Sequence, residues 1–249
     1  HRVLAVDGEG RVEVIATVPG QPSGLGWLPD GRMLVVSMLD RKLLRQEGDG
    51  RLVEHADLSK IATYHCNDMV VDTQGRAYVG NFGSDIESGN KLVKAKLAFV
   101  DTDGSVSVAA EDLAFPNGAV ITPNGKTLII GESFGRCLTA FDIADDGGLS
   151  NRRVWANLHP HIPDGICLDA EGAIWLADPA NHCVVRVAEG GDVLQKIEIS
   201  NGTFACMLGG EDRKTLFVCT AAGSGSKAEE RLTAKIEACE VSVPGVGCP

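Results

Sequence analysis

A hairpin pattern that recurs along the chain constrains its fold more than any other feature of the sequence. Each copy has an apolar segment, a polar turn that contains or ends in glycine and a second apolar segment, as in GLGWLPDGRMLVVS, residues 24–37. Four turn glycines, Gly31, Gly75, Gly125 and Gly172, follow one another at intervals of 44, 50 and 47 residues. Asp-Gly and Asn-Gly turns are strong hairpin signals, and a repeat of about 40–50 residues is typical of a β-propeller blade.

A second, more polar hairpin follows each of the first four copies, as in AFVDTDGSVSVAAEDL, residues 98–113. Two hairpins make one four-stranded antiparallel blade. A fifth copy of the first hairpin lies at residues 206–220, and residues 1–20 match only the outer hairpin of a blade. The pattern therefore predicts an all-β, six-bladed propeller, one domain over residues 1–249, whose first blade lacks its inner hairpin. Either a segment that precedes His1 supplies that hairpin or the first blade is incomplete.

Composition and charge exclude several classes of protein. Acidic residues outnumber basic ones by 34 to 23, so the formal charge is −11, and both kinds are scattered along the chain. A nucleic-acid partner is therefore not expected. Apolar runs stay far below the roughly 20 residues that cross a bilayer, so we expect a soluble protein with no membrane partner. The eight cysteines form no CxxC pair, which favours reduced thiols and a cytoplasmic location, while a Cys206–Cys219 disulfide stays open.

In four copies of the repeat, one position carries an oxygen-bearing side chain. Eight residues before the turn glycines stand Ser23, Asn67, Asn117 and Asp164. Equivalent positions at the start of the innermost strands of a propeller form a ring around its central channel. Such oxygen atoms suit Ca²⁺, Mg²⁺ or Mn²⁺ better than Zn²⁺. The alternative is that these residues only cap loop backbone, as Asn, Asp and Ser often do.

The segments around these residues resemble one protein family. FPNGAVITPNGKTLIIGESFGRCLTAFDI (115–143) and IPDGICLDAEGAIWLADPANHCVVRV (162–187) are similar to the SMP-30/gluconolactonase/LRE (regucalcin-like) family. The resemblance implies a six-bladed propeller that hydrolyses sugar lactones with a divalent metal ion on its axis. It implies Asn117 and Asp164 as metal ligands. A glutamate that completes the family's metal site has no counterpart in this chain.

The resemblance also implies roles for residues of the second copy of the repeat. Asn67, in the motif HCNDMVVD, is expected to bind the substrate or a water on the metal. His65 stands where family members that handle sugar acids often have arginine, so the identity of the substrate stays open, and both His65 and Asp68 are candidate substrate contacts. The expected cofactor is a divalent cation, Ca²⁺ first and Mg²⁺, Mn²⁺ or Zn²⁺ as alternatives. The expected partner is a small-molecule lactone, and the expected assembly is a monomer or a small homo-oligomer.

The implied reaction is the hydrolysis of a carboxylic ester in carbohydrate metabolism. A divalent cation polarises the lactone carbonyl and acidifies a water, and a nearby carboxylate takes the proton. Asp164 is the expected catalytic residue, as ligand, general base or both. Two alternatives stay open: a metal-binding propeller without catalysis, and a propeller aryl esterase or phosphotriesterase. His159 and His161 form an HxH pair, but without a third nearby imidazole we expect them to line the surface or a pocket.

Overall fold

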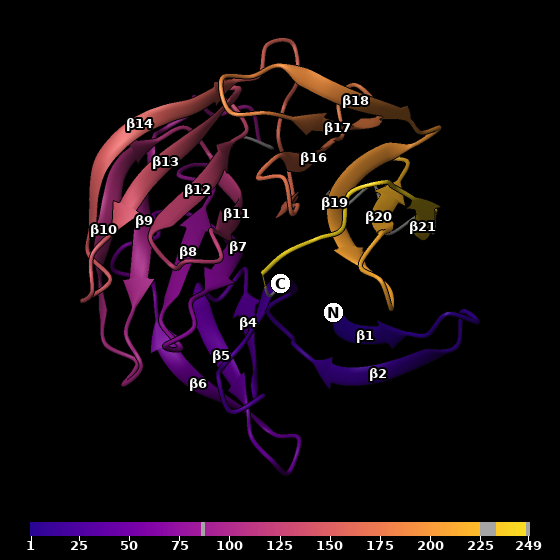
Figure 1. Cartoon of the computed structure of the whole chain (residues 1–249). Helices are drawn as coiled ribbons and strands as arrows, with labels where there is room; N and C mark the ends of the chain where they lie inside the picture. The colour runs from indigo at the N-terminus through magenta and orange to yellow at the C-terminus, as the bar shows by residue number, and fades with distance from the viewer. Residues whose placement is uncertain (86–87, 225–232, 248–249) are drawn as a thin grey trace. The chain divides into compact units, whose positions relative to one another are not determined.

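The computed structural model describes residues 1–85, 88–224 and 233–247, and its regular elements in these ranges are β-strands. The chain divides into two compact units, His1–Leu113 and Ala114–Pro249. Each unit holds complete antiparallel sheets of its own, in which strands that are neighbours in the chain are neighbours in space. In Figure 1 the colour of each sheet gives its place in the chain.

The first unit contains one two-stranded hairpin and two four-stranded sheets. The hairpin consists of β1 (Arg2–Val6) and β2 (Val12–Thr17). The first sheet consists of β3 (Pro22–Trp27), β4 (Met33–Ser37), β5 (Lys42–Gln46) and β6 (Leu52–Asp57). The second sheet consists of β7 (Cys66–Val71), β8 (Ala77–Asn81), β9 (Ala95–Val100) and β10 (Val106–Leu113).

The second unit contains two four-stranded sheets and one sheet with three strands among the described residues. The first of these sheets consists of β11 (Pro116–Ile121), β12 (Thr127–Glu132), β13 (Cys137–Ile143) and β14 (Leu149–Asn157). The next consists of β15 (Ile166–Leu168), β16 (Ile174–Asp178), β17 (Cys183–Val187) and β18 (Val193–Glu198). The last consists of β19 (Gly202–Gly209), β20 (Thr215–Ala221) and β21 (Lys235–Glu240).

The all-β, propeller-type prediction is confirmed, but the predicted number of blades is wrong. Within the described ranges the chain forms five blade sheets, two in the first unit and three in the second. Residues 1–20 do form the expected hairpin, yet β1 pairs with β2, and among the described residues no further strand extends that sheet. A two-stranded hairpin is not a blade, because it cannot bury two faces as a four-stranded sheet does. The prediction of a single domain over residues 1–249 stays a prediction.

The turn glycines have the conformation that the repeat requires of them. In the first copy the Gly31 amide donates to the Leu28 carbonyl, and the Leu28 amide donates to the Arg32 carbonyl. Gly31 has a φ of 84°, and Gly172 in the fourth copy has a φ of 78°. This left-handed region is open to glycine and strained for residues with a Cβ. The hairpin therefore closes through a three-residue turn that ends in glycine.

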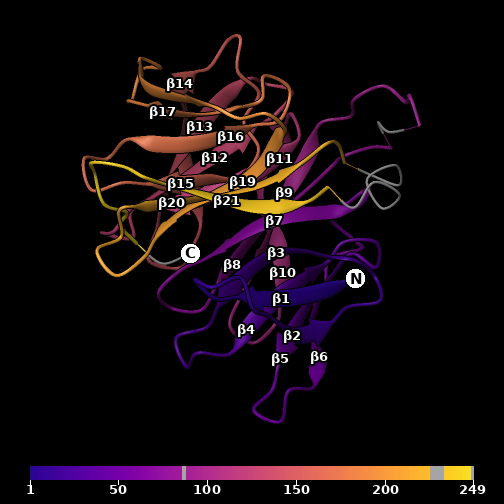
Figure 2. The same cartoon turned by 90° about the vertical axis from the view of Figure 1, so that its right-hand side faces the viewer.

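The core of each unit lies between neighbouring sheets. In the first unit Val3 and Ala16 of the hairpin pack with Met33 and Val35 of β4 in one buried cluster, and Figure 2 shows the hairpin beside β3 and β4. In the second unit one large cluster joins β12, β13, β16 and β17, and another joins β16 to β19 and β20. Strand β16 is buried along its whole length, as expected of a strand with a packed sheet on each face.

A buried polar residue ends the second strand of each four-stranded sheet. These residues are Ser37, Asn81, Glu132 and Asp178. Ser37, Asn81 and Asp178 make hydrogen bonds within the turn that follows: for example, the Asn181 amide donates to Asp178 Oδ1 at 3.1 Å. Glu132 Oε2 instead accepts from the Ala114 amide, before β11, at 2.6 Å. Burial without such a partner costs about 1–3 kcal/mol. In three of the sheets the position therefore stabilises the turn between the second and third strands.

Two further expectations concern the cysteines and the membrane. The seven described cysteines are free, so the Cys206–Cys219 disulfide is not formed, and Cys248 lies outside the described residues. Cys66, Cys167, Cys183 and Cys206 are buried, and Cys219 is exposed. In the part of the chain that the structure describes, no helix has the length and apolar character needed to cross a membrane.

Candidate functional site: a metal group and a substrate group

In three of the four copies, the oxygen-bearing position lies at an irregularity in the first strand of its sheet. The register of β3 with β4 shifts between Pro22 and Leu25, and that of β11 with β12 shifts between Pro116 and Ala119. The register of β7 shifts in the same way between Cys66 and Met69. Bulges of this kind redirect side chains and are common beside functional sites. Ser23, Asn67 and Asn117 lie within these shifts, and Asp164 lies just before β15.

In the first unit the structure brings Ser23 and Asn67 together. Ser23 Oγ donates to Asn67 Oδ1 at 3.3 Å. The contact is possible because Gly24 carries no side chain: a Cβ there would lie 2.7 Å from the Met69 amide nitrogen. Equal offsets in two copies of the repeat therefore become neighbours in space, as the sequence predicted for this pair.

Asp68, the next residue, is a carboxyl group held largely away from water. The Met69 amide donates to Asp68 Oδ1 at 2.9 Å, which favours the charged form. Burial has the larger effect and raises the pKa of Asp68 from 3.8 to about 6. The side chain still keeps some exposed surface, so it remains accessible to a small molecule. Carboxyl groups with a pKa raised by desolvation are common at functional sites.

His65 lies in a small aromatic cluster of the same unit. Its ring stacks on Tyr64 with centroids 3.9 Å apart and meets the edge of Phe82 at 6.0 Å. The Phe82 amide donates to the His65 carbonyl at 2.9 Å. The imidazole is therefore held by flat apolar surfaces on two sides while it remains partly exposed. Its neighbours were not evident from the sequence, because Phe82 follows β8 and is distant in the chain.

In the second unit Asn117 and Asp164 lie on adjacent segments. The Gly118 amide donates to the Asp164 carbonyl at 3.2 Å, and a Cβ on Gly118 would lie 2.5 Å from that same oxygen. Asn117 is buried, and its Nδ2 donates to Ser133 Oγ at 3.1 Å. Ser133 Oγ donates in turn to the Pro163 carbonyl at 2.7 Å. Ser133 thus connects Asn117 to the residue before Asp164, a contact that the sequence did not indicate.

The two side chains are of types that a hard divalent cation prefers. A carboxylate and an amide oxygen are ligands that Ca²⁺ and Mg²⁺ prefer. Asn117 Nδ2 donates to Ser133 Oγ, so Oδ1 of the same amide group points away from Ser133. The donor set has only one formal negative charge, and affinity falls as the number of charged ligands falls.

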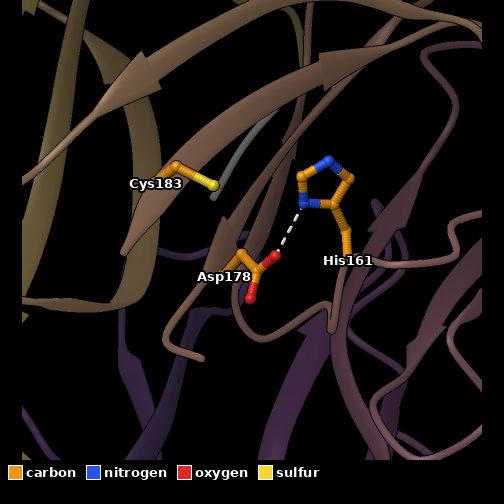
Figure 3. A group of neighbouring side chains, drawn as sticks. All are labelled: His161, Asp178 and Cys183. Atoms are coloured by element: carbon orange, nitrogen blue, oxygen red, sulfur yellow. Dashed lines mark hydrogen bonds and ion pairs between the residues drawn. The ribbon is translucent and has the colours of Figure 1, made fainter. Parts of the chain in front are cut away.

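A different group of possible metal ligands lies elsewhere in the second unit. His161, Asp178 and Cys183 place one ligand atom each within 4.8 Å of one another, and all three residues are buried. Figure 3 shows the His161 ring and the Cys183 sulfur turned to the Asp178 carboxylate, with a hydrogen bond of 2.7 Å from His161 Nδ1 to Asp178 Oδ2. His159 is exposed. Nothing in the sequence indicated this group, because the HxH pair suggested a metal site only together with a third histidine. The residues that accompany His161 are instead a carboxylate and a thiol.

Comparison with known proteins yields one family and a set of relatives. A family model described as SMP-30/Gluconolactonase/LRE-like region matches residues 1–222. Pentonolactonase XacC of Haloferax volcanii is 28% identical over 200 residues, which is 79% of this chain and 66% of that protein. Regucalcin of Danio rerio is 29% identical over 77% of this chain and 66% of its own length. The 6-deoxy-6-sulfogluconolactonase of Pseudomonas putida is 27% identical over 74% of this chain and 64% of its own length.

Solved structures share the fold. A luciferin-regenerating enzyme superposes with a TM-score of 0.81 and 18% identity over 96% of this chain and 84% of that chain. A gluconolactonase from Xanthomonas campestris gives a TM-score of 0.72 and 23% identity over 88% of this chain and 75% of that chain. At these identities the likeness concerns the fold. The chain spans about two thirds or less of the length of the curated relatives.

Proposed function

Because the chain belongs to the SMP-30/gluconolactonase/LRE-like family, we propose that it is a metal-dependent hydrolase that opens the ring of a sugar lactone or a similar small lactone. Relatives named as a pentonolactonase and a sulfogluconolactonase support this substrate class. The proposed class of reaction is hydrolysis of a carboxylic ester.

The observation that carries the proposal is the pairing of Asn117 with Asp164. Two oxygen donors from different copies of the repeat lie on adjacent segments, joined by the Gly118–Asp164 backbone hydrogen bond and by Ser133. Capping of loop backbone would explain a single Asn or Asp at this position. It does not explain why both residues lie eight positions before a turn glycine and are linked through Gly118 and Ser133. We propose that Asn117 and Asp164 hold a divalent cation, Ca²⁺ before Mg²⁺, Mn²⁺ or Zn²⁺.

The proposed chemistry assigns a task to each side chain. A divalent cation held there supplies Lewis-acid chemistry, which polarises a carbonyl and lowers the pKa of water. Asp164 accepts the proton of the attacking water, as a carboxylate general base does. Asn117 orients the attacking water and the ring oxygens of the lactone through its amide group. The hydrogen bond to Ser133 fixes the orientation of that amide.

The residues of the first unit are proposed substrate contacts. Asn67 and Asp68 offer an amide and a carboxyl group that can hydrogen-bond sugar hydroxyls. His65 offers an imidazole beside two aromatic rings, a surface suited to the carbon face of a sugar ring. The family resemblance implies arginine at this position in members that handle sugar acids, so with His65 here we expect a substrate that does not require a strong cationic partner.

Substitution of Asp164 tests this function. We expect Asp164→Ala to abolish lactone hydrolysis measured with added Ca²⁺, Mn²⁺ or Zn²⁺, while circular dichroism shows an intact fold. Asp192→Ala is the matched control, because Asp192 is an exposed aspartate just before β18, in the same blade as Asp164. The Asp192→Ala variant should hydrolyse the lactone at the wild-type rate. EDTA should remove the wild-type activity. Near-normal turnover by the Asp164→Ala variant would reject the assignment, and a folded wild-type protein that hydrolyses no lactone would reject the function.

A further inference from the structure

The buried group of His161, Asp178 and Cys183 has no role in the proposed lactonase. We propose that these three residues form a second metal site, which takes a borderline or soft divalent cation of the Zn²⁺ class. Its donors are a thiol, an imidazole and a carboxylate, whereas Asn117 and Asp164 offer oxygen alone. Thiolate and imidazole ligands select Zn²⁺ and similar ions over Ca²⁺. The two metal groups of the second unit would therefore bind different classes of ion.

The backbone holds the three donors in place before any metal binds. Asp178 ends β16 and Cys183 begins β17, and the two residues are direct partners in the strand ladder. His161 lies in the segment between β14 and β15, where its own amide donates to the Leu158 carbonyl at 2.6 Å. The donors thus come from three segments fixed by main-chain hydrogen bonds. Because the backbone of these segments is already ordered, cation binding loses little conformational entropy.

The distances are close to those of a zinc site. With Zn–N and Zn–O distances of about 2.0–2.2 Å and a Zn–S distance of about 2.3 Å, tetrahedral ligand atoms lie about 3.4–3.6 Å apart. His161 Nδ1 and Asp178 Oδ2 are 2.7 Å apart, and the three ligand atoms lie within 4.8 Å of one another. The Nδ1–Oδ2 pair must therefore open by about 0.7–0.9 Å when a cation enters, which breaks their hydrogen bond.

Surrounding hydrogen bonds orient the Asp178 carboxylate. Asn181 donates to Asp178 Oδ1 from its backbone amide at 3.1 Å and to Oδ2 from Nδ2 at 2.7 Å. Outer contacts of this kind orient ligands and strengthen metal binding. Relative exposures of 8% for His161 and 0% for Asp178 and Cys183 place the group in a low-dielectric setting, where charges interact strongly.

Metal binding changes the protonation of the site in a balanced way. Burial, and then the Asp178 carboxylate, raise the pKa of the Cys183 thiol to about 11. As a thiolate ligand, Cys183 gives up its proton to solvent when a cation binds. His161 would bind through Nδ1, so the proton that Nδ1 shares with Asp178 is given up to solvent while Nε2 carries the ring proton. The thiolate and the carboxylate then neutralise the charge of the divalent cation.

Titration of the metal-free protein with Co²⁺, a spectroscopic substitute for Zn²⁺, tests the proposal. We expect a thiolate-to-cobalt charge-transfer band that saturates and is displaced by Zn²⁺. The band should disappear in Cys183→Ser and persist in Cys219→Ser, a matched control because Cys219 is exposed. It should also persist in Asp164→Ala, which separates this site from the proposed lactonase site.

A second variant covers the case in which Cys183→Ser does not fold. His161→Gln retains a donor for Asp178 but loses the imidazole ligand, so Co²⁺ affinity should fall about tenfold or more while the thermal unfolding midpoint of the metal-free protein changes little. If the wild type gives no band, or if the band survives in both Cys183→Ser and His161→Gln, the group is only a hydrogen-bonded cluster and the proposal is overturned.

Discussion

At the scale of single residues, Asp68 combines a proposed function with a cost in stability. Its pKa is raised from 3.8 to about 6 because burial disfavours the carboxylate. The native state therefore binds this proton more tightly than the unfolded state does. Protonated Asp68 therefore adds to the free energy of unfolding below about pH 4. This contribution is lost as the pH rises through the native-state pKa of about 6, where the buried group must ionise.

We expect Asp68→Asn to raise the free energy of unfolding at pH 7.5. A pKa shift of about 2 units corresponds to about 3 kcal/mol, and since the side chain is partly exposed we expect a gain of about 1–2 kcal/mol. Denaturant unfolding between pH 4 and 8 measures this gain, which should vanish at the acidic end. The exposed Asp192→Asn is the control. A variant that is less stable than the wild type at pH 7.5 would contradict the assignment of burial as the main cause.

Asn67 tests the division between metal ligands and substrate contacts. We expect Asn67→Ala to lower kcat/KM about 10- to 100-fold, as loss of one positioned hydrogen-bonding group does. The affinity for Ca²⁺ should change much less than in Asp164→Ala. Isothermal titration with Ca²⁺, together with lactone kinetics, measures both quantities. Equal losses of activity and Ca²⁺ affinity would make Asn67 a direct metal ligand instead.

At the scale of elements, the glycine that follows the polar residue sets how closely the innermost strands approach. A Cβ on Gly118 would lie 2.5 Å from both the Asp164 carbonyl oxygen and the Ile166 amide nitrogen. A Cβ on Gly165 would lie 2.8 Å from the Ala205 Cα. Both neighbours are backbone and have little freedom to move. The Pro-Asn-Gly and Pro-Asp-Gly motifs therefore have a packing role as well as a proposed chemical one.

Gly118→Ala should lower the free energy of unfolding by about 2–3 kcal/mol, the usual cost of forcing extra atoms into a packed region. Gly48→Ala is the matched control, because a Cβ at Gly48 meets nothing within 4 Å, and its change should stay within about 0.5 kcal/mol. Urea unfolding of both variants measures the difference. Equal stability of the two variants would show that the strands adjust at no cost.

Local patterns in the sequence account for the hairpins and for the oxygen-bearing position. Turn glycines need a positive φ and recur at similar intervals of 44–50 residues, so Gly31 and Gly172 identify their turns without a structure. The bulges of β3, β7 and β11 were not predictable, because a register shift depends on pairing with the next strand. The contacts of Ser133 and Phe82 were not predictable either, since they join residues that are distant in the chain.

At the scale of the whole molecule, periodicity predicted the class of fold but not the number of blades. A hairpin at residues 1–20 has the same pattern as the outer half of a blade, and only its pairing shows that it stands as a two-stranded sheet. The group of His161, Asp178 and Cys183 was missed for a related reason. Its members belong to three segments whose proximity depends on the packing of one blade, and no spacing rule links a thiol, an imidazole and a carboxylate.

The division of the chain into two units gives metal binding a distinct signature. Asn117 and Asp164 both belong to the second unit, Ala114–Pro249. A ligand that binds only the native state stabilises it by about 2.7 kcal/mol at 100 times its Kd. We therefore expect saturating Ca²⁺ to slow amide hydrogen exchange most strongly in β11 and β15, next to the two proposed ligands.

The same exchange experiment separates the two proposed sites. Zn²⁺ should add protection at the end of β16 and the start of β17, where Asp178 and Cys183 lie, and Ca²⁺ should not. Asp164→Ala should lose the Ca²⁺ effect and keep the Zn²⁺ effect, whereas Cys183→Ser should show the reverse. Protection by Ca²⁺ that is centred in the first unit would contradict the placement of the oxygen ligands. Identical exchange patterns for the two ions would mean that they share one site.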